Sequence, residues 1–462
     1  MRLSHARRAV SVRFDDPNLV SCGGLAAVLG LAARCGLGGL VADRVRITAK
    51  GGANAAAKVL ALVAGMVAGA DSIEDLGLLR HGGMPRLFTE VRAPSTLGTF
   101  LRCFSFGHVR QLDAVAGRLL ARLATATPLL SGAGQVAFLD IDDTVKATYG
   151  YAKQGTGRGY TGVNGLNVLL ATVCTPLSAP VIAATRLRKG STNSVRGAGK
   201  LLADALACAR AAGASGLLIV RADSAYYSHA IIAAARRAGA RFSVTARQTP
   251  AVTTAIAGID EHAWTPIHYP NAVFDEAEQR WISDAEVAEV AFTAFTGRRR
   301  AEHVTARLIV RRVKRLNPIT VPAGQGQMFA VYRYHAVFTD SPEPMLDAEA
   351  THRDHAIIEQ VIADLKDSAL AHLPSGVFTA NAAWLICAAI AHNLTRAAGA
   401  LASIRHGRAR TATIRAHLIG TPARIARSAG RLALHLPADW PWQSALEELF
   451  ARALHDPLPA TP

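Results

Sequence analysis

The chain has 462 residues, of which half are hydrophobic and only 18% are charged, so its composition excludes a disordered protein. Its 51 lysines and arginines outnumber 34 acidic residues, and the formal charge of +17 favours a polyanionic partner such as nucleic acid. A genome that prefers arginine to lysine would produce part of the same excess. The six cysteines form no C-x-x-C pair, which argues against a disulfide framework or a zinc site.

No stretch of the sequence predicts a membrane span or a signal peptide. The apolar run from Leu19 to Ala33 is interrupted by Arg34, and the run from Val59 to Ala70 is shorter than the ~20 residues that a spanning helix needs. The first 18 residues carry basic side chains but no apolar segment followed by a cleavage site. We therefore expect a soluble, cytoplasmic protein.

Residues 1–130 predict a helical domain. Segments rich in alanine and leucine alternate with breaks that contain glycine and proline, and Ser72 with Asp75 matches a capping box at the start of one helix. Basic residues near its ends suit DNA binding or dimerisation. A purely packing role explains the composition nearly as well.

Residues 131–247 change to an α/β pattern, which we interpret as the first part of a catalytic core. The predicted order is three strands, a helix, a strand, a helix and a strand, and two of the strands finish on an acidic residue, where open sheets place their sites. The predicted elements are Val136–Asp142, Leu166–Cys174, Pro180–Leu187, Ser194–Ala212, Gly216–Asp223, Ser228–Ala238 and Arg241–Ala246.

The strand from Val136 is apolar until it reaches two carboxylates, and we expect it to break at Asp143 and Thr144. Because side chains alternate along a strand, Asp140 and Asp142 point to the same side, roughly 7 Å apart. Carboxylates at the end of a buried strand are costly unless something neutralises them, and a divalent cation is a common solution. A simple pair of turn-forming acids is the alternative.

Residues 248–345 predict a β-rich insertion, because short β-prone segments lie between turn residues. The segments are Trp264–Tyr269, Val287–Phe295, Val304–Val313 and Gln327–Phe338. Two basic runs in the insertion favour a surface that follows DNA phosphates, although such runs also coat ordinary solvated faces. The candidate DNA-binding residues in these runs are Arg298, Arg299, Arg300, Arg311 and Arg312.

Residues 346–398 predict the second part of the core, with a long helix through His352–Lys366 and a buried apolar helix over Asn381–Ala398. On the first helix, Ile358, Val361, Ile362 and Leu365 cover the core side, while the other face carries His352, His355, Glu359 and Lys366. Residues 399–462 predict a basic helical tail. Seven arginines and no acid lie between residues 401 and 438, which favours DNA contact over a merely solvated tail.

Three separated acids, Asp142, Asp223 and Glu359, are the candidate catalytic residues and metal ligands. Asp142 and Asp223 finish neighbouring predicted strands, and Glu359 returns from a helix after the insertion. Converging carboxylates suit two Mg²⁺ ions, or Mn²⁺ in their place, and not zinc. Such a pair of ions activates a water or a 3′-hydroxyl and stabilises the leaving oxygen of a phosphodiester.

In these segments the chain resembles the DDE transposases of bacterial insertion sequences, in the branch whose ribonuclease H-like core is interrupted by a β-rich insertion. The resemblance implies an α/β fold with a mixed sheet and flanking helices. It also implies binding of double-stranded DNA at terminal inverted repeats and at the target, cut-and-paste transposition, a homodimer on DNA and association with the nucleoid. The segments that carry it are Leu139–Thr144, Arg221–Tyr227, Ala263–Pro266, Arg307–Arg312 and the helix through Glu359.

The signature of that branch on the last helix is Tyr, two residues, Arg, three residues, Glu, six residues and Lys. Glu359 and Lys366 match it, whereas His352 and His355 stand at the first two positions. The resemblance makes both histidines and Lys366 candidate DNA contacts, but a histidine carries full charge only when protonated. An H-x-x-H metal site with Glu359 is an alternative for this helix.

Two further functions stay open at this stage. The strand with Asp140 and Asp142 also fits the D-x-D-x-T motif of haloacid-dehalogenase phosphatases, with Asp140 as nucleophile and Asp142 as general acid. The later acid pair of that superfamily is missing after Asp223, which is followed by Ser-Ala-Tyr-Tyr-Ser-His229. The other alternative is a DNA-binding relative without catalytic activity.

Overall fold

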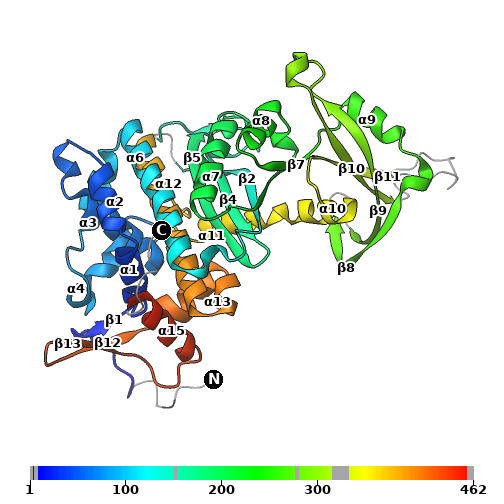
Figure 1. Ribbon diagram of the computed structural model, residues 1–462. Coiled ribbons are helices and arrows are strands. Elements are labelled where there is room, and N and C mark those ends of the chain that lie inside the picture. The colour runs from blue at the N-terminus through cyan, green and yellow to red at the C-terminus, as the bar shows by residue number, and fades with distance from the viewer. Residues whose placement is uncertain are drawn as a thin grey trace.

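The computed structural model describes residue 4 and residues 9–149, 153–159, 161–275, 280–314 and 332–454. Helices gather at one end of the molecule, a sheet with flanking helices occupies the centre, and a strand-rich part lies at the other end (Figure 1). The described strands form a mixed sheet of ten in the order β3-β4-β2-β6-β7-β11-β10-β9-β8, with β5 paired to β4. The chain is therefore a mixed α/β protein.

The N-terminal region is helical, as the sequence predicts. The backbone N–H of Ser72 donates to the Asp75 carboxylate at 3.1 Å, and the backbone N–H of Asp75 donates to the Ser72 hydroxyl at 3.3 Å. This pair lies at the start of a 3₁₀ helix, η3 (Glu74–Arg80). A short strand, β1 (Leu19–Val20), was not expected. The described α-helices are α1 (Leu25–Arg34), α2 (Leu37–Arg44), α3 (Ala55–Ala68), α4 (Met84–Leu87), α5 (Pro94–Arg102) and α6 (Phe106–Ala126).

The central part has the predicted order of strands and helices. Strand β2 is antiparallel to β4 and parallel to β6, and β6 is parallel to β7. Apolar residues on both faces bury these strands, as the near-continuous hydrophobic runs indicate. The bounds are β2 (Val136–Ala147), β3 (Gly157–Arg158), β4 (Asn164–Thr175), β5 (Ser178–Lys189), α7 (Ala198–Ala211), β6 (Leu217–Ala222), α8 (His229–Arg237) and β7 (Arg241–Thr245).

Strand β2 does not break at Asp143 and Thr144, so that expectation was wrong. Antiparallel pairing with β4 continues to Ala147, opposite Gly165. Parallel pairing with β6 stops earlier, at Ile141 opposite Ala222. Asp142 therefore lies inside β2, and the strand that ends beside it is β6.

The strand-rich part continues the central sheet. Strand β11 pairs with β10 on one side and with β7 on the other, through Val337, Phe338 and Thr339. The first residues of the predicted strand over 327–338, up to 331, lie outside the described residues. The bounds are α9 (Pro250–Ala257), which the sequence did not suggest, β8 (Thr265–Asp275), β9 (Arg280–Ala294), β10 (Val304–Lys314) and β11 (Tyr332–Thr339).

The helix expected to run unbroken from His352 to Lys366 is divided. Helix α10 (Met345–Arg353) leads back from the strand-rich part, a 3₁₀ turn, η9 (Asp354–Ala356), follows, and α11 (Ile357–Lys366) lies against the central sheet (Figure 1). The core face of α11 is confirmed, because Ile358, Val361, Ile362 and Leu365 are all buried.

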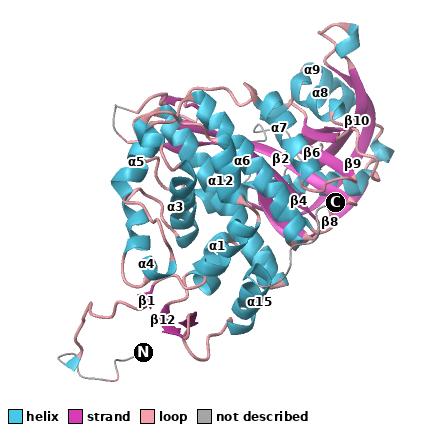
Figure 2. Ribbon diagram, turned by 60° about the vertical axis from the view of Figure 1, so that its left-hand side comes forward, coloured by secondary structure: helices cyan, strands magenta, loops and turns pink. Residues whose placement is uncertain are grey.

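Helix α12 (Phe378–Ala402) is the central helix of the molecule, because it contacts α3 and α6 on one side and β5 on the other (Figure 2). Among the described helices it is long and apolar enough to span a membrane, as is the bent pair of α1 and α2 if counted as one helix. However, 94% of the most apolar window of α12 is buried inside the protein. Packing within the protein thus accounts for the apolar surface of α12.

The C-terminal region is neither wholly helical nor a loose tail, which corrects the expectation for residues 399–462. Strands β12 and β13 form a hairpin that pairs with β1 near the N-terminus, and α15 packs on α1 and α12. Ile414, Leu418 and Leu449 are fully buried. The bounds are α13 (Ile404–Arg408), α14 (Thr411–Ile414), a π-helical turn (Arg415–Ile419), β12 (Ala423–Ser428), β13 (Arg431–His435) and α15 (Gln443–Leu454).

Asn393 connects α12 to the sheet. Its side chain accepts a hydrogen bond from the backbone N–H of Ile182 and donates one to the carbonyl of Ile182, both at 2.8 Å. We expect Asn393→Ala to lower the free energy of unfolding by about 2–4 kcal/mol, because two buried backbone groups of β5 lose their partners. Urea unfolding followed by circular dichroism measures the change.

The matched control is Thr395→Val on the same buried helix. Thr395 donates to the carbonyl of Ala391 within α12, and its loss affects no strand. We expect this control to lower the free energy of unfolding by less than about 1 kcal/mol. Equal losses in the two variants would contradict a specific role of Asn393 in holding β5.

Candidate active site

Asp142 and Asp223 follow the last residue pair between two parallel strands. Ile141 of β2 is opposite Ala222 of β6, so the two aspartates come next on adjacent strands. The backbone N–H of Asp143 donates to Asp142 Oδ1 at 2.7 Å, and the N–H of Ala225 donates to Asp223 Oδ1 at 3.0 Å. The second contact caps a 3₁₀ turn, η5 (Ser224–Tyr226), which turns the chain away from the sheet.

Glu359 lies on the exposed side of the first turn of α11, within electrostatic range of Asp142. The pKa of Asp142 rises to about 7, mainly through burial. The N–H of Asp143 acts against this rise, and the charges of Asp223, Asp143 and Glu359 add to it. Within the described part of the chain, no group of three or more His, Cys, Asp or Glu has the geometry to hold a metal.

Asp140 is neutralised inside the protein. Arg221 donates to its two carboxylate oxygens, from Nε at 2.7 Å and from Nη2 at 2.8 Å, and the side chains are only 1% and 2% exposed. Burial raises the pKa of Asp140, and the guanidinium acts against this rise. The analysis of the sequence did not find this pair, although an arginine inside an otherwise apolar strand was the available signal.

Asp143 points to the opposite face of β2 and belongs to a second buried cluster. It accepts hydrogen bonds from the Tyr226 hydroxyl, at 2.7 Å, and from the Asn167 side chain, and Nη2 of Arg188 lies 3.0 Å from its Oδ2. Burial and the neighbouring carboxylate raise the pKa of the Tyr226 phenol. This cluster was not expected, because the strand was predicted to break at Asp143. Its contacts fix β2 beside Asp142.

His352 is buried and not on the exposed face predicted for it, because α10 packs against β9 and β10 and ends before α11 begins. Its Nδ1 lies 3.0 Å from Ser243 Oγ and its Nε2 lies 2.9 Å from Thr245 Oγ1. Burial lowers its pKa to about 3, with a contribution from His355. His352 is therefore neutral, and both its ring nitrogens contact the protein.

His355 is half-buried and remains close to the acids. Its ring stacks on His352 with a centroid distance of 4.9 Å, and its Nδ1 lies 2.7 Å from the carbonyl oxygen of His352. His355 influences the pKa values of both Asp140 and Asp223, which places it on their side of the sheet. Of the two histidines, His355 is the less buried.

The two predicted basic runs have different environments. Arg298, Arg299 and Arg300 are exposed in the connection between β9 and β10, and Arg298 contacts Glu302 at 3.4 Å. In contrast, Arg311 contacts Glu349 at 3.2 Å. Arg312 is buried between Glu261 and Glu286.

The second run is therefore not a solvated basic surface, which corrects the expectation for Arg311 and Arg312. Acidic partners hold both side chains, and the guanidinium of Arg312 also lies 4.2 Å from the ring centre of Trp264. These contacts satisfy the two arginines within the fold. The exposed run from Arg298 to Arg300 is thus the part of the prediction that remains available for DNA.

Lysines lie on the same side of the sheet as the acids. Lys366 is exposed in the last turn of α11. The pKa of Lys146 is lowered first by its own burial and then by the charge of Lys366. Lys146 follows Asp142 by four residues on β2, so it points to the same face. Lys146 was not among the predicted site residues. The two ammonium groups make this part of the surface suitable for phosphate.

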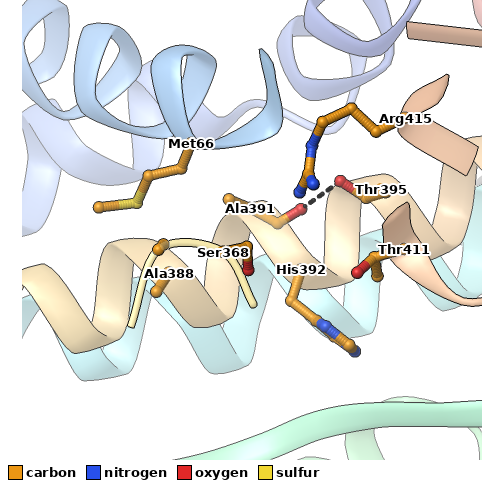
Figure 3. Close-up of a pocket in the computed structure, with 9 residues that line it drawn as sticks. Met66, Ser368, Ala388, Ala391, His392, Thr395, Thr411 and Arg415 are labelled. Atoms are coloured by element: carbon orange, nitrogen blue, oxygen red, sulfur yellow. Dashed lines mark hydrogen bonds between the residues drawn. The ribbon is translucent and has the colours of Figure 1, made fainter. Parts of the chain in front are cut away.

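A small enclosed pocket elsewhere offers no comparable chemistry. Figure 3 shows it between α3, α12 and the C-terminal region, with Met66, His392, Thr411 and Arg415 around it. Its volume is about 10 Å³, which is room for one water. Burial is the main reason that the pKa of His392 falls to about 4, and the positive charge of Arg396 adds to this effect. The acids on β2 and β6 therefore remain the candidate active site.

The raised pKa of Asp142 predicts how metal-free protein responds to pH. In the unfolded chain Asp142 titrates near 3.8, and in the folded chain near 7. The stability that protonated Asp142 contributes is complete below pH 3.8 and is lost as the pH rises through 7. At pH 8 we expect Asp142→Asn to raise the free energy of unfolding by about 1–3 kcal/mol, because it removes the charge.

Urea unfolding in EDTA from pH 4 to pH 8 measures this difference. We expect the advantage of Asp142→Asn over the wild type to shrink as the pH falls and to vanish near pH 4. Asp43→Asn, an exposed change on α2, is the control and should show no such trend. A difference that does not vary with pH would contradict the raised pKa.

Comparison with known families agrees with this geometry. A family model described as transposase DDE domain group 1 matches residues 3–456, which is nearly the whole chain. No curated protein shows significant similarity to the chain. The match covers the helical N-terminal region, the strands that carry the acids and the C-terminal region alike, so the chain belongs to the DDE transposase family.

Proposed function

We propose that the protein binds the terminal inverted repeats of an insertion sequence, cleaves DNA strands at these ends and joins the freed 3′-hydroxyls to target DNA. The observation that carries this proposal is the position of three acids. Asp142 and Asp223 follow the last pair of two parallel strands, and Glu359 lies within electrostatic range of Asp142. Membership of the DDE transposase family supports the same activity.

The topology supports a ribonuclease H-like core. Strands β5, β4 and β2 are neighbours in antiparallel pairs, and β6 and β7 follow in parallel. In this proposal residues 131–247 and 346–398 form the core and residues 248–345 are an insertion that extends its sheet through β11. Residues 1–130 would contribute DNA binding or dimerisation, together with the packed C-terminal region from residue 399.

The acids fit a hard divalent cation, because their donor atoms are carboxylate oxygens. Burial, with a smaller contribution from the neighbouring acids, raises the pKa of Asp142, and a bound cation would offset both effects. Asp142, Asp223 and Glu359 would hold two Mg²⁺ ions, for which Mn²⁺ can substitute. Bound ions supply activation of the attacking oxygen and neutralisation of charge on the phosphodiester.

Around the acids, this chain's own side chains orient the DNA. Lys146, Lys366 and His355 face the side of the sheet that carries the acids and would contact the phosphates next to the cleaved bond. Arg298, Arg299 and Arg300 would follow the DNA backbone further away. Since both ends of an element must be held together, a homodimer on DNA is expected, in the bacterial cytoplasm at the nucleoid.

The alternative enzymes fit the structure less well. A D-x-D-x-T phosphatase needs Asp140 as a free nucleophile, but both of its oxygens accept hydrogen bonds from Arg221. An H-x-x-H metal site needs a nitrogen of His352, and both of its nitrogens contact hydroxyl groups. A DNA-binding relative without activity shares the fold, so cleavage itself must be measured.

The first test replaces the acids. We expect Asp142→Asn, Asp223→Asn and Glu359→Gln each to reduce cleavage of DNA carrying the terminal repeats by at least about 10³-fold in Mg²⁺, because each removes a charged metal ligand. Binding of the same DNA should change less than about threefold, because the basic surface is retained. Strand breaks on denaturing gels and gel-shift titrations measure the two effects.

Asp367→Asn is the matched control, since Asp367 immediately follows α11 but is not among the acids that influence Asp142. Normal cleavage by Glu359→Gln would remove α11 from the active site. Phosphatase activity that disappears with Asp140→Asn alone would instead support the phosphatase.

A second test concerns the exposed basic run. Replacing Arg298, Arg299 and Arg300 by glutamine should reduce the slope of log affinity against log salt by about 2–3, because each neutralised phosphate releases close to one counterion. DNA binding measured between 50 and 300 mM salt gives the slope.

The control for this test is replacement of three exposed arginines of the C-terminal region, Arg405, Arg408 and Arg431, by glutamine. Both variants change the net charge equally, so a loss of slope in the first variant alone would assign the phosphate contacts to the run. An equal loss would show that the run has no preference over the C-terminal region, which is also proposed to bind DNA. We chose substitutions and not a deletion of the C-terminal region, because a deletion would expose the buried core residues of α15 and of the π-helical turn.

A further inference from the structure

Arg221 joins the strand that leads to Asp223 to the strand of Asp142 and to α10, the helix that precedes the segment of Glu359. It belongs to β6, which leads to Asp223, and it donates to Asp140 of β2, the strand of Asp142. Its Nη1 donates to the carbonyl of Thr351 in α10 at 2.7 Å, and α10 leads through η9 to Glu359. A single guanidinium thus connects the three segments on which the site depends.

We propose that Arg221 is a positioning residue that sets the spacing of Asp142, Asp223 and Glu359, with Asp140 as its anchor. The proposal rests on the proposed function and extends it to residues that contact neither DNA nor metal. It assigns a purpose to the buried acid that the phosphatase motif would have used as a nucleophile.

The register of the sheet explains how the pair acts on the two aspartates. Asp140 is directly opposite Arg221 in the parallel pairing of β2 with β6. Each residue precedes a candidate catalytic aspartate by two positions, so each side chain lies on the same face of its strand as that aspartate. The two hydrogen bonds between the pair therefore fix how far β2 and β6 can slide or separate immediately before their acids.

The contact with Thr351 extends this control to the third acid. Thr351 lies in the last turn of α10, where backbone carbonyls lack partners within the helix. The chain changes direction in the following 3₁₀ turn, and Glu359 lies in the first turn of the next helix. Holding the end of α10 against the sheet fixes the point from which α11 starts.

The surroundings leave the guanidinium one orientation. Its central carbon lies 4.3 Å from the ring centre of Phe138, and Nη2 lies 3.8 Å from Cys174 Sγ. An apolar pair of similar volume would satisfy the core at least as well, since buried ion pairs contribute little net stability. What an arginine adds is a planar fork that makes several directed hydrogen bonds at once, which lysine cannot reproduce.

The test compares Arg221→Lys with Arg396→Lys. Arg396 is buried to a similar degree and donates to the backbone carbonyls of Gly407 and Ala409. It lies on α12, and of the segments that carry the candidate acids its charge interacts only with Asp364, near the end of α11. Binding of Mn²⁺ to the full-length protein without DNA is followed by electron paramagnetic resonance. Cleavage of repeat DNA is measured against Mg²⁺ concentration.

For Arg221→Lys we expect Mn²⁺ affinity to fall at least tenfold, and the Mg²⁺ concentration for half-maximal cleavage to rise by a similar factor, with DNA affinity unchanged within about twofold. Arg396→Lys should lower the melting temperature but leave both metal dependences within twofold. Equal metal effects in the two variants, or none in Arg221→Lys, would overturn the proposal.

Asp140→Asn provides a second variant of nearly the same shape, for which we expect at least a threefold loss of Mn²⁺ affinity. Failure of both Arg221→Lys and Asp140→Asn to fold would also overturn the proposal, because the pair would then be needed for the fold and not for spacing. A wild-type protein that binds Mn²⁺ but never cleaves DNA would refute the proposed function alone. The Mn²⁺ measurements would still decide the role of Arg221.

Discussion

The structure depends on how one strand accommodates three carboxylates. Asp140, Asp142 and Asp143 all lie in β2, in the middle of the ten-stranded sheet, where an uncompensated charge is expensive. Asp140 is compensated by Arg221, and Asp143 by Arg188 together with Tyr226 and Asn167. Asp142 has the backbone N–H of Asp143 and otherwise faces further acids. Two of the three carboxylates are structural because arginines are built in for them, and the third remains for a ligand.

This division also explains why the net charge is a poor guide to the DNA-binding surface. Arg188, Arg221 and Arg312 are nearly or fully buried beside carboxylates of the protein itself. Others at the C-terminal end, such as Arg410, contact acids across the fold. The net charge of +17 shows that the protein is basic. It does not show which basic side chains are free to contact a polyanion. Burial and the positions of acidic partners make that selection.

The sequence alone was sufficient for the order of strands and helices in the core, because hydrophobic periodicity and buried apolar runs report it directly. It was also sufficient for the apolar face of α11. It was not sufficient for the end of β2, since the continuation of that strand depends on pairing with β4. The burial of His352 depends on contacts with Ser243 and Thr245, more than 100 residues earlier in the chain. The hairpin of β12 and β13 likewise forms on β1 from the other end of the chain.

The same contrast applies to the candidate site. Asp142, Asp223 and Glu359 could be proposed from the sequence because two of them finish predicted strands and the third matches the spacing of a family signature. Their supporting residues, in contrast, look like ordinary core arginines and tyrosines. The supporting residues are nevertheless what makes the acids usable. Burial is the main cause of the raised pKa of Asp142, and the charges of Asp223 and Glu359 add to it. If β2 and β6 could separate freely, this repulsion would be relieved by moving the strands apart. If Arg221 is the positioning residue that we propose, its pair with Asp140 prevents this relaxation, so that the repulsion is retained in the folded protein and would favour a cation between the acids.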